Sequence, residues 1–299
     1  MHGWIILDKP VGPGSTQAVS AVKRALRDGG YGKFKVGHGG TLDPLASGVL
    51  PIAVGEATKL AGRMLDSDKV YTFTIAFGEQ TDTLDTEGAV TATSAVRPTA
   101  QALAAALPDF TGTIDQMPPA YSALKVDGKR AYDLARAGEE VTLATRRITI
   151  HALDIESAPA ADPLESATLV AYVSKGTYIR SLARDIAAAL GTVGHVTMLR
   201  RLKAGPFTLD GAISLDKLAE AGKARELEDL LLPLGAGLDD IPAIALDPDQ
   251  AEALRQGRVL TGFAADDGLH VALSGEVPVA LVGIEDGNVR VVRGFNMET

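Results

Sequence analysis

The chain has 299 residues, 46% of them hydrophobic, which is enough to bury a sizeable core in one large domain or in one large and one small domain. It contains no cysteine, which excludes disulfides, cysteine-ligated zinc, iron–sulfur clusters and thiol nucleophiles together. The net charge of −9 is uneven, because residues 1–205 carry 22 Lys and Arg against 21 Asp and Glu and residues 206–299 carry 7 against 17, so the first two thirds can still present a basic face to phosphates.

The N-terminal stretch predicts a strand followed by a helix. Trp4 to Leu7 is an apolar run that reads as a buried strand ending at Asp8-Lys9-Pro10. Ser15 is a suitable cap for a helix that ends near Gly29-Gly30. No basic stretch followed by a long apolar segment opens the chain, and no apolar run is long enough to span a bilayer, so we expect a cytoplasmic protein.

The next segment is a glycine-rich loop around a single aspartate, Asp43. It runs Gly37-His38-Gly39-Gly40-Thr41-Leu42-Asp43-Pro44-Leu45-Ala46-Ser47-Gly48-Val49-Leu50-Pro51, with no cation within four residues of Asp43. Glycines let the backbone approach a ligand closely, and Pro44 pushes Asp43 toward an extended conformation. Asp before Pro commonly starts a turn, and a carboxylate in such surroundings can equally do chemistry. The local sequence leaves both interpretations open.

The middle of the chain contains both predicted strands and predicted helices. Tyr71 to Phe77 is a strand, with Tyr71, Phe73, Ile75 and Phe77 on one face. Residues 79–92 are polar and acidic and are predicted to be a loop, and Pro98 to Leu107 is a predicted helix. Further strands are expected at 147–154 and 167–174, and a helix capped by Thr177 is expected to stop at Gly191.

Residues 117–147 are rich in cations interleaved with tyrosines. Part of this segment, Lys129 to Ala137, can form a short helix. One interpretation is a solvated amphipathic helix, since nearby acids offset the charge. The other is a surface that contacts the phosphates of RNA. The candidates for phosphate contacts are Lys125, Lys129, Arg130 and Arg136.

The last third predicts a separate small module. A helical region at 214–232 stops at Pro233, and Gly235 to Gly237 reads as a linker. We expect a small β-rich domain at 240–299, with a helix at Pro248 to Gln256 and paired strands around a turn at Asp286-Gly287. Strands and helices without regular βα alternation predict an α+β fold with a mixed, largely antiparallel sheet.

Most familiar catalytic motifs are absent from the sequence. The glycines at 37–40 match neither the P-loop nor the dinucleotide-binding spacing. The scattered histidines do not suggest a metal site, and no serine has the context of a nucleophile elbow. Glycoside cleavage would need a second carboxylate within reach of Asp43, which the sequence does not reveal.

Six segments, in order, resemble the TruB-type tRNA pseudouridine synthases, and together they span residues 3 to about 205. They are Asp8-Lys9-Pro10, the Asp43 loop from Gly37 to Pro51, Lys69-Val70-Tyr71, Pro118-Pro119-Ala120-Tyr121-Ser122-Ala123-Leu124-Lys125, Ser174-Lys175-Gly176-Thr177-Tyr178-Ile179-Arg180-Ser181-Leu182-Ala183-Arg184-Asp185, and Leu199-Arg200-Arg201.

The resemblance implies a pseudouridine synthase fold, with a mixed, largely antiparallel central sheet flanked by helices. It implies a catalytic domain at 1–235, in which the insertion 117–147 closes over the T-arm of tRNA, and a small PUA-like domain at 240–299. The implied reaction turns uridine 55 of the T-loop into pseudouridine after the base has been flipped out. The implied enzyme needs no cofactor and no metal, and we expect a monomer that does not bind membranes.

The resemblance also implies roles for residues. Asp43 is the nucleophile, which attacks either the base or the ribose. Arg180, otherwise readable as a solvated helix residue, supplies the counter-charge that is missing near Asp43 in sequence. Tyr71, otherwise a core aromatic, stacks on the base and is a candidate for removing the C5 proton. The substrate pocket is further lined by His38, Tyr178 and Leu199.

Two other functions remain to be weighed. A non-catalytic RNA-binding or tRNA-folding protein on the same scaffold would not require Asp43, Tyr71 and Arg180 together. A carboxylate-dependent glycosidase would leave the basic segment 117–147 unexplained.

Overall fold

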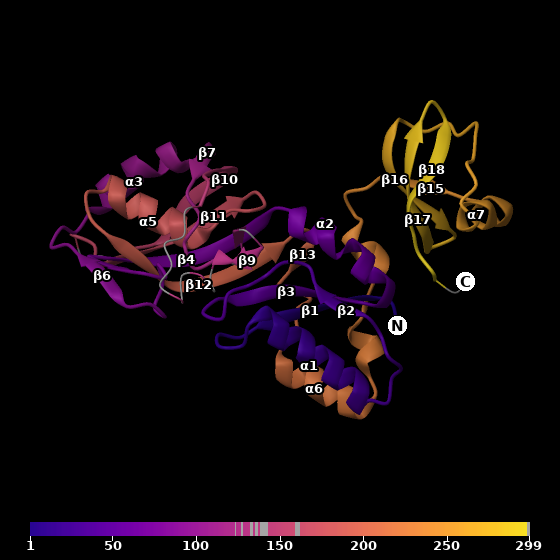
Figure 1. Ribbon diagram of the computed structural model, residues 1–299, viewed down its shortest axis with the longest axis horizontal. Helices are drawn as coiled ribbons and strands as arrows, with labels where there is room; N and C mark the ends of the chain where they lie inside the picture. Colours follow the sequence, from indigo (N-terminus) through magenta and orange to yellow (C-terminus); the bar gives the residue numbers. More distant parts are fainter. Residues whose placement is uncertain are drawn as a thin grey trace.

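The computed structural model describes residues 1–122, 124–126, 128–131, 134, 137, 143–158 and 162–297. Figure 1 shows a long sheet with helices against it and a smaller, C-terminal sheet beside it. This is the α+β architecture that the sequence predicts, with two sheets of different size.

The large sheet has ten strands in the order β14-β1-β3-β12-β4-β11-β10-β7, with β2 added to β3 and β13 to β12. Its pairings are antiparallel except where β3 meets β12, which are parallel over only two residue pairs, Ser47 with Arg200 and Gly48 with Arg201. Its strands are β1 (Gly3–Lys9), β2 (Val36–His38), β3 (Ser47–Val54), β4 (Lys69–Phe77), β7 (Gly112–Gln116), β10 (Arg146–Ser157), β11 (Ser166–Val173), β12 (Gly194–Ala204), β13 (Phe207–Thr208) and β14 (Leu232–Pro233).

Two apolar clusters cover the large sheet. The larger one joins it to α1, α3, α5 and α6, and the second joins it to η1, α2 and the C-terminal sheet. The helices are α1 (Ser15–Asp28), α2 (Ala61–Asp66), α3 (Ala100–Ala106), α5 (Ile179–Ala189), α6 (Leu215–Ala224) and α7 (Pro248–Arg255), with 3₁₀ turns η1 (Gly55–Leu60), η2 (Leu107–Phe110), η3 (Leu227–Leu230) and η4 (Leu234–Gly237). None of the described helices is long and apolar enough to cross a membrane.

Strand β4 confirms the alternation expected at 71–77. Phe73, Ile75 and Phe77 are buried in the larger cluster, and Tyr71 packs against it while remaining partly exposed. This pattern leaves the Tyr71 ring at the edge of the core, where it can also face a ligand.

Helix α1 starts differently from the prediction. Its N-cap is Gly14, and Ser15 is the first helical residue. The Ser15 hydroxyl accepts a hydrogen bond from the Leu42 amide at 2.8 Å and donates one to the Leu42 carbonyl at 3.1 Å. Ser15 therefore holds the Asp43 loop instead of capping the helix.

Two other expectations need correction. The segment 79–92, predicted to be a loop, contains a small hairpin of β5 (Glu79–Thr81) and β6 (Val90–Thr93). Lys129–Arg130, predicted to open a helix, form β9, which pairs with β8 (Lys125–Val126). Both strand pairs are too short to show the alternation of apolar and polar residues that predicts a strand.

The C-terminal sheet contains β15 (Ala243–Ala245), β16 (Gly268–Ser274), β17 (Val277–Glu285) and β18 (Asn288–Gly294). The predicted turn is confirmed: Asp286 and Gly287 have φ of 49° and 70°, as a tight hairpin requires. The predicted linker Gly235 to Gly237 is not a free connector, because η4 packs on the large sheet and the Trp4 indole donates to the Leu234 carbonyl at 3.2 Å.

Candidate active site

A cavity of about 460 Å³ opens where β3 and β12 come together. The short parallel contact at this point lets the loop before β3 lie against the middle of β12 and the start of β4. The walls also include the loop after β5 and the N-terminal end of α5. Five of the predicted site residues line this cavity: Asp43, Tyr71, Tyr178, Arg180 and Leu199.

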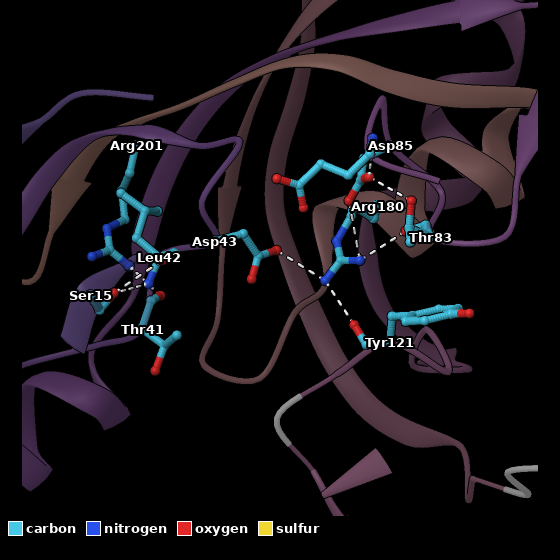
Figure 2. A network of polar contacts seen from close by, with 10 residues as sticks. Ser15, Thr41, Leu42, Asp43, Thr83, Asp85, Tyr121, Arg180 and Arg201 are labelled. Atoms are coloured by element: carbon cyan, nitrogen blue, oxygen red, sulfur yellow. Dashed lines mark hydrogen bonds and ion pairs between the residues drawn. The ribbon is translucent and has the colours of Figure 1, made fainter. Parts of the chain in front are cut away.

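Asp43 and Arg180 form an ion pair across the cavity, as Figure 2 shows. The Arg180 Nη2 lies 3.0 Å from the Asp43 Oδ2, and 37% of the Asp43 side chain is exposed against 8% of Arg180. The predicted counter-charge is thereby confirmed. The geometry leaves the carboxylate open to a ligand while its positive partner is buried.

A second carboxylate, Asp85, fixes the other side of Arg180. Its Oδ2 lies 3.3 Å from the Arg180 Nη1, and its side chain is 2% exposed. The Thr83 hydroxyl and the Glu87 amide donate to Asp85, at 2.5 and 2.9 Å. Asp85 therefore orients the guanidinium of Arg180.

Backbone carbonyls complete the coordination of Arg180. Nη1 donates to the Thr83 carbonyl at 2.8 Å, and Nη2 donates to the Tyr121 carbonyl at 3.0 Å. A planar guanidinium with five donors can satisfy such a divergent set, whereas a lysine ammonium cannot. Arg180 is therefore fixed by three separate segments of chain around one exposed carboxylate.

The loop that carries Asp43 is fixed on both sides of the aspartate. Ser15 bonds to Leu42, and the Gly12 amide donates to the Pro44 carbonyl at 2.8 Å. The Lys9 ammonium is fully buried beneath the loop and donates to the carbonyls of Pro10 and Pro13, each at 2.8 Å. The Asp-Pro turn therefore exists as the local sequence suggested, and it aims the carboxylate into the cavity.

Arg201 on β12 links the two ends of this loop. Its guanidinium is 1% exposed and donates to the carbonyls of Gly40 and Thr41, each at 3.2 Å, and of Val49 at 2.7 Å. Gly48 adopts φ of 104° directly against the Arg201 backbone, where a Cβ would lie 2.2 Å from its carbonyl oxygen. Glycine is required there on both conformational and steric grounds.

Buried cations outnumber buried carboxylates around the cavity. Lys9, Lys69, Arg180 and Arg201 are buried, against Asp85 alone among the buried acids of the described residues. Burial lowers the pKa of Lys9 to about 8, and Asp43 partly opposes that effect. Burial, and then Arg201, lower the pKa of Lys69 to about 8. The surplus of positive charge favours an anionic ligand.

Lys69 holds the end of α2 beside the cavity. Its ammonium donates to the carbonyls of Met64 at 2.9 Å, Leu65 at 2.8 Å and Ser67. These carbonyls have no partner within the helix, and a cation at a helix C-terminus also interacts favourably with the helix dipole.

Tyr178 and Leu199 form the rest of the wall near Tyr71. The buried Gln116 side chain accepts from the Tyr178 amide at 2.8 Å and donates to its carbonyl at 3.1 Å, which fixes the start of α5. Burial raises the pKa of the Tyr178 phenol, so this group stays protonated at neutral pH. Leu199 is 6% exposed and supplies an apolar surface.

The remaining predicted residues are not brought into the cavity wall. His38 lies outside the lining; its Nδ1 accepts from the Gly40 amide at 3.4 Å, and burial and then Arg201 lower its pKa. Lys125, Lys129 and Arg130 lie in the β8–β9 hairpin, and Arg136 lies outside the described residues. In the described ranges no group of acids and histidines is placed to hold a metal ion.

Sequence reasoning missed Asp85, Thr83 and Arg201. Asp85 and Thr83 lie in the segment 79–92, which the sequence predicts to be an acidic loop. No neighbouring residue in the sequence indicates that Asp85 is buried. Arg201 was noted only within the motif Leu199-Arg200-Arg201. Its neighbour Arg200 instead reaches outward to Asp8, at 2.8 Å. Strand alternation distinguishes the two arginines once β12 is recognised as a strand.

Comparison with protein families places this site in a known group. The family model described as "TruB family pseudouridylate synthase (N terminal domain)" matches residues 27–179. The model described as "tRNA pseudouridylate synthase B C-terminal domain" matches residues 180–239.

Relatives named tRNA pseudouridine synthase B match the whole chain. The protein from Novosphingobium aromaticivorans is 67% identical over 299 residues, covering 100% of this chain and 98% of the relative. The protein from Zymomonas mobilis is 61% identical over 296 residues, covering 99% of this chain and 96% of the relative.

Solved structures share the fold at low sequence identity. An H/ACA ribonucleoprotein bound to a substrate RNA containing 2′-deoxyuridine contains a chain 22% identical to this one, with a TM-score of 0.74 over 99% of this chain and 85% of that chain. A chain of an archaeal box H/ACA Nop10–Cbf5 complex is 23% identical, with a TM-score of 0.71 over 98% and 85%.

Proposed function

The chain belongs to the TruB family of pseudouridylate synthases and isomerises uridine to pseudouridine in tRNA, and from this premise we propose that its target is uridine 55 in the T-loop and that Asp43 is its nucleophile. The observation that carries the proposal is the partly exposed Asp43 carboxylate, paired at 3.0 Å with a buried Arg180 in the wall of the same cavity.

The reaction requires a group of this kind. The bond between C1′ of the ribose and N1 of uracil breaks, the base rotates, and a bond between C1′ and C5 forms. N1 gains a proton and C5 loses one, so the change is an isomerisation without a redox partner. Asp43 serves by adding either to the base or to C1′, and both routes need an ionised carboxylate at the reacting atom.

Arg180 provides the counter-charge of Asp43 and orients its carboxylate. Its bond to Asp85 and the two carbonyls fixes it before substrate arrives, so no reorganisation is needed during the reaction. Tyr71, at the cavity edge, is positioned to stack on the extruded base and is our candidate for removing the C5 proton. Leu199 and Tyr178 limit the access of water to the intermediate.

The surplus of buried positive charge fits a phosphate-bearing substrate. We assign Lys125, Lys129, Arg130 and Arg136 to the phosphates of the T-arm, His38 to the RNA next to the target, and residues 117–147 to an insertion in a catalytic domain at 1–235. The segment 240–299 would be a PUA-like module. We also assign the enzyme to the cytoplasm, as a monomer.

A glycosidase would need a second carboxyl group that acts as a general acid beside Asp43, and the described part of this site does not supply one. A second carboxylate, Asp85, does share Arg180 with Asp43, but it is buried and accepts from Thr83 and Glu87. Both of its oxygens are engaged by Arg180, Thr83 and Glu87, so it is not free to act on a leaving group as a general acid.

Mapping pseudouridine at nucleotide resolution tests the target. Unmodified tRNA is incubated with the protein, in parallel with tRNA in which cytidine replaces uridine 55. We expect one new pseudouridine, at position 55, and none in the substituted tRNA. Modification elsewhere, with position 55 untouched, would overturn the assignment of the target.

A further inference from the structure

Two serine hydroxyls are buried without a hydrogen bond of regular geometry among the residues that the structure describes: those of Ser122 and Ser181. Ser122 is 3% exposed and Ser181 is fully buried. A buried hydroxyl without a well-aligned partner destabilises the folded protein. Native proteins rarely accept this cost without a reason, such as a ligand that satisfies the group.

The two serines differ in one respect. Ser122 lines the catalytic cavity together with Tyr178 and Arg180, whereas Ser181 lies one residue further along α5 and is not part of the lining. The chain at Ser122 is also tied to the reacting centre, because the carbonyl of the preceding residue, Tyr121, accepts from Arg180 at 3.0 Å. The Ser122 hydroxyl therefore lies close to the group that orients Asp43.

A second hydroxyl faces Ser122. Burial raises the pKa of the Tyr178 phenol, and Arg146 and a close side-chain contact with the Ser122 hydroxyl, within hydrogen-bonding reach, partly oppose that effect. The two hydroxyls lie near each other, but Ser122 Oγ has no hydrogen bond of regular geometry in the described structure. An oxygen or N–H of a ligand between them would satisfy Ser122, since each hydroxyl can both donate and accept.

We propose that Ser122 is a substrate-binding residue, whose hydroxyl forms a hydrogen bond with an oxygen of the extruded nucleotide in the catalytic cavity. This inference rests on the proposed function, because it takes the occupant of the cavity to be the target uridine. The well-aligned hydrogen-bond partner of the Ser122 hydroxyl would then be an atom of the substrate and not of the protein.

The proposal predicts an unusual combination of effects for Ser122→Ala. Removing an unsatisfied hydroxyl should leave the thermal midpoint of the free protein unchanged or raise it. The same change should lower kcat/KM for unmodified tRNA about tenfold, the value of one ordinary hydrogen bond. Ser181→Ala is the matched control: it should also keep or raise the midpoint, with kcat/KM within twofold of the parent.

A second pair of substrates identifies the partner atom. The affinity of parent and Ser122→Ala is compared for tRNA with uridine and with 2′-deoxyuridine at the target. A penalty that disappears with 2′-deoxyuridine assigns the bond to the ribose 2′-oxygen. A penalty of the same size with both substrates assigns it to an oxygen of the base or of the phosphate.

The proposal is overturned if Ser122→Ala keeps kcat/KM within twofold of the parent. It is also overturned if Ser122→Ala lowers the thermal midpoint along with activity, because the hydroxyl would then have a structural partner. Either result leaves the proposed function intact as long as the parent modifies position 55. Failure of the proposed function would instead appear as a parent that leaves position 55 unmodified.

Discussion

The catalytic cavity and the C-terminal sheet bury different kinds of side chain. Around the cavity Lys9, Lys69, Asp85, Arg180 and Arg201 are all buried. In the β15–β18 sheet and α7, the buried side chains of the described residues are apolar, with His270 as the exception.

The excess of acidic residues lies in the other region, the C-terminal third of the chain. Residues 206–299, which include the C-terminal sheet, carry 17 acidic against 7 basic residues. The chain thus places its acidic excess on the surface of one region and buries cations in the other. Burying a charge is costly unless it is paired and hydrogen-bonded. Among the described residues, buried charges are therefore found in the region proposed to carry out the reaction and not in the C-terminal sheet. Substitutions around the cavity should change the catalytic rate, whereas substitutions in the C-terminal sheet should change only the free energy of unfolding.

The largest effect is expected for Arg180→Met, which leaves Asp85 buried without its counter-charge. We expect the free energy of unfolding to fall by about 3–5 kcal/mol and the single-turnover rate to fall by a factor of about 10³ or more. Urea denaturation and the rate of pseudouridine formation measure the two effects. The control Arg184→Met, on the same helix, should change stability by less than about 1 kcal/mol, since its ion pair with Asp185 is partly exposed. Equal effects of the two substitutions would contradict the role of Arg180.

Lys69→Met should change how the free energy of unfolding depends on pH, because it removes a buried ammonium. Lys69 has a folded pKa of about 8 against an ordinary value of 10.5. Between these values the unfolded chain binds more protons than the folded one, so the parent gains stability as pH rises. The stability of the parent relative to Lys69→Met should therefore increase by up to about 3 kcal/mol between pH 8 and 10.5. A difference independent of pH, measured by chemical denaturation, would contradict the burial of a charged Lys69.

Arg201→Lys should separate positioning from binding. Lysine keeps the charge but cannot donate to Gly40, Thr41 and Val49 together. We expect the single-turnover rate to fall by about 10- to 100-fold through displacement of the Asp43 loop, while the Kd for tRNA stays within twofold. Arg200→Lys is the control, and its rate should stay within threefold because that side chain is half-exposed. A loss confined to Kd would contradict the positioning role.

The smallest effect is expected in the C-terminal sheet. Ile284→Val removes one methylene from a side chain 3% exposed and should lower the free energy of unfolding by about 1 kcal/mol. At saturating tRNA the rate should be unchanged within twofold. A rate loss larger than the loss caused by Arg201→Lys would remove the distinction between the two regions.

Local patterns predict what depends on neighbours in sequence. The alternation at 71–77 and the Asp286-Gly287 turn are confirmed because each depends on a few adjacent residues. The ion pair between Asp43 and Arg180 could be predicted only because the segments that carry the two residues resemble those of the TruB family.

Long-range contacts explain the failures. Asp85 could not be recognised because its buried partner, Arg180, comes from a helix that is distant in sequence. Ser15 has the sequence of a cap, but its hydroxyl bonds to Leu42, from a different loop. Gly235 to Gly237 has the composition of a linker. The contact that fixes it, from the Trp4 ring to Gly237, comes from the first strand and is not visible in the local sequence. These residues act through tertiary contacts, which local propensity does not encode.

Tritium release from uridine C5 tests the central claim, that Asp43 is the nucleophile, most directly. Unmodified tRNA labelled at C5 is mixed with an excess of parent protein or of Asp43→Asn, which is nearly isosteric. The parent should release the tritium of one uridine per tRNA, and Asp43→Asn should release essentially none while binding tRNA and keeping its thermal midpoint. Release by a folded Asp43→Asn at a rate close to that of the parent would contradict the assignment.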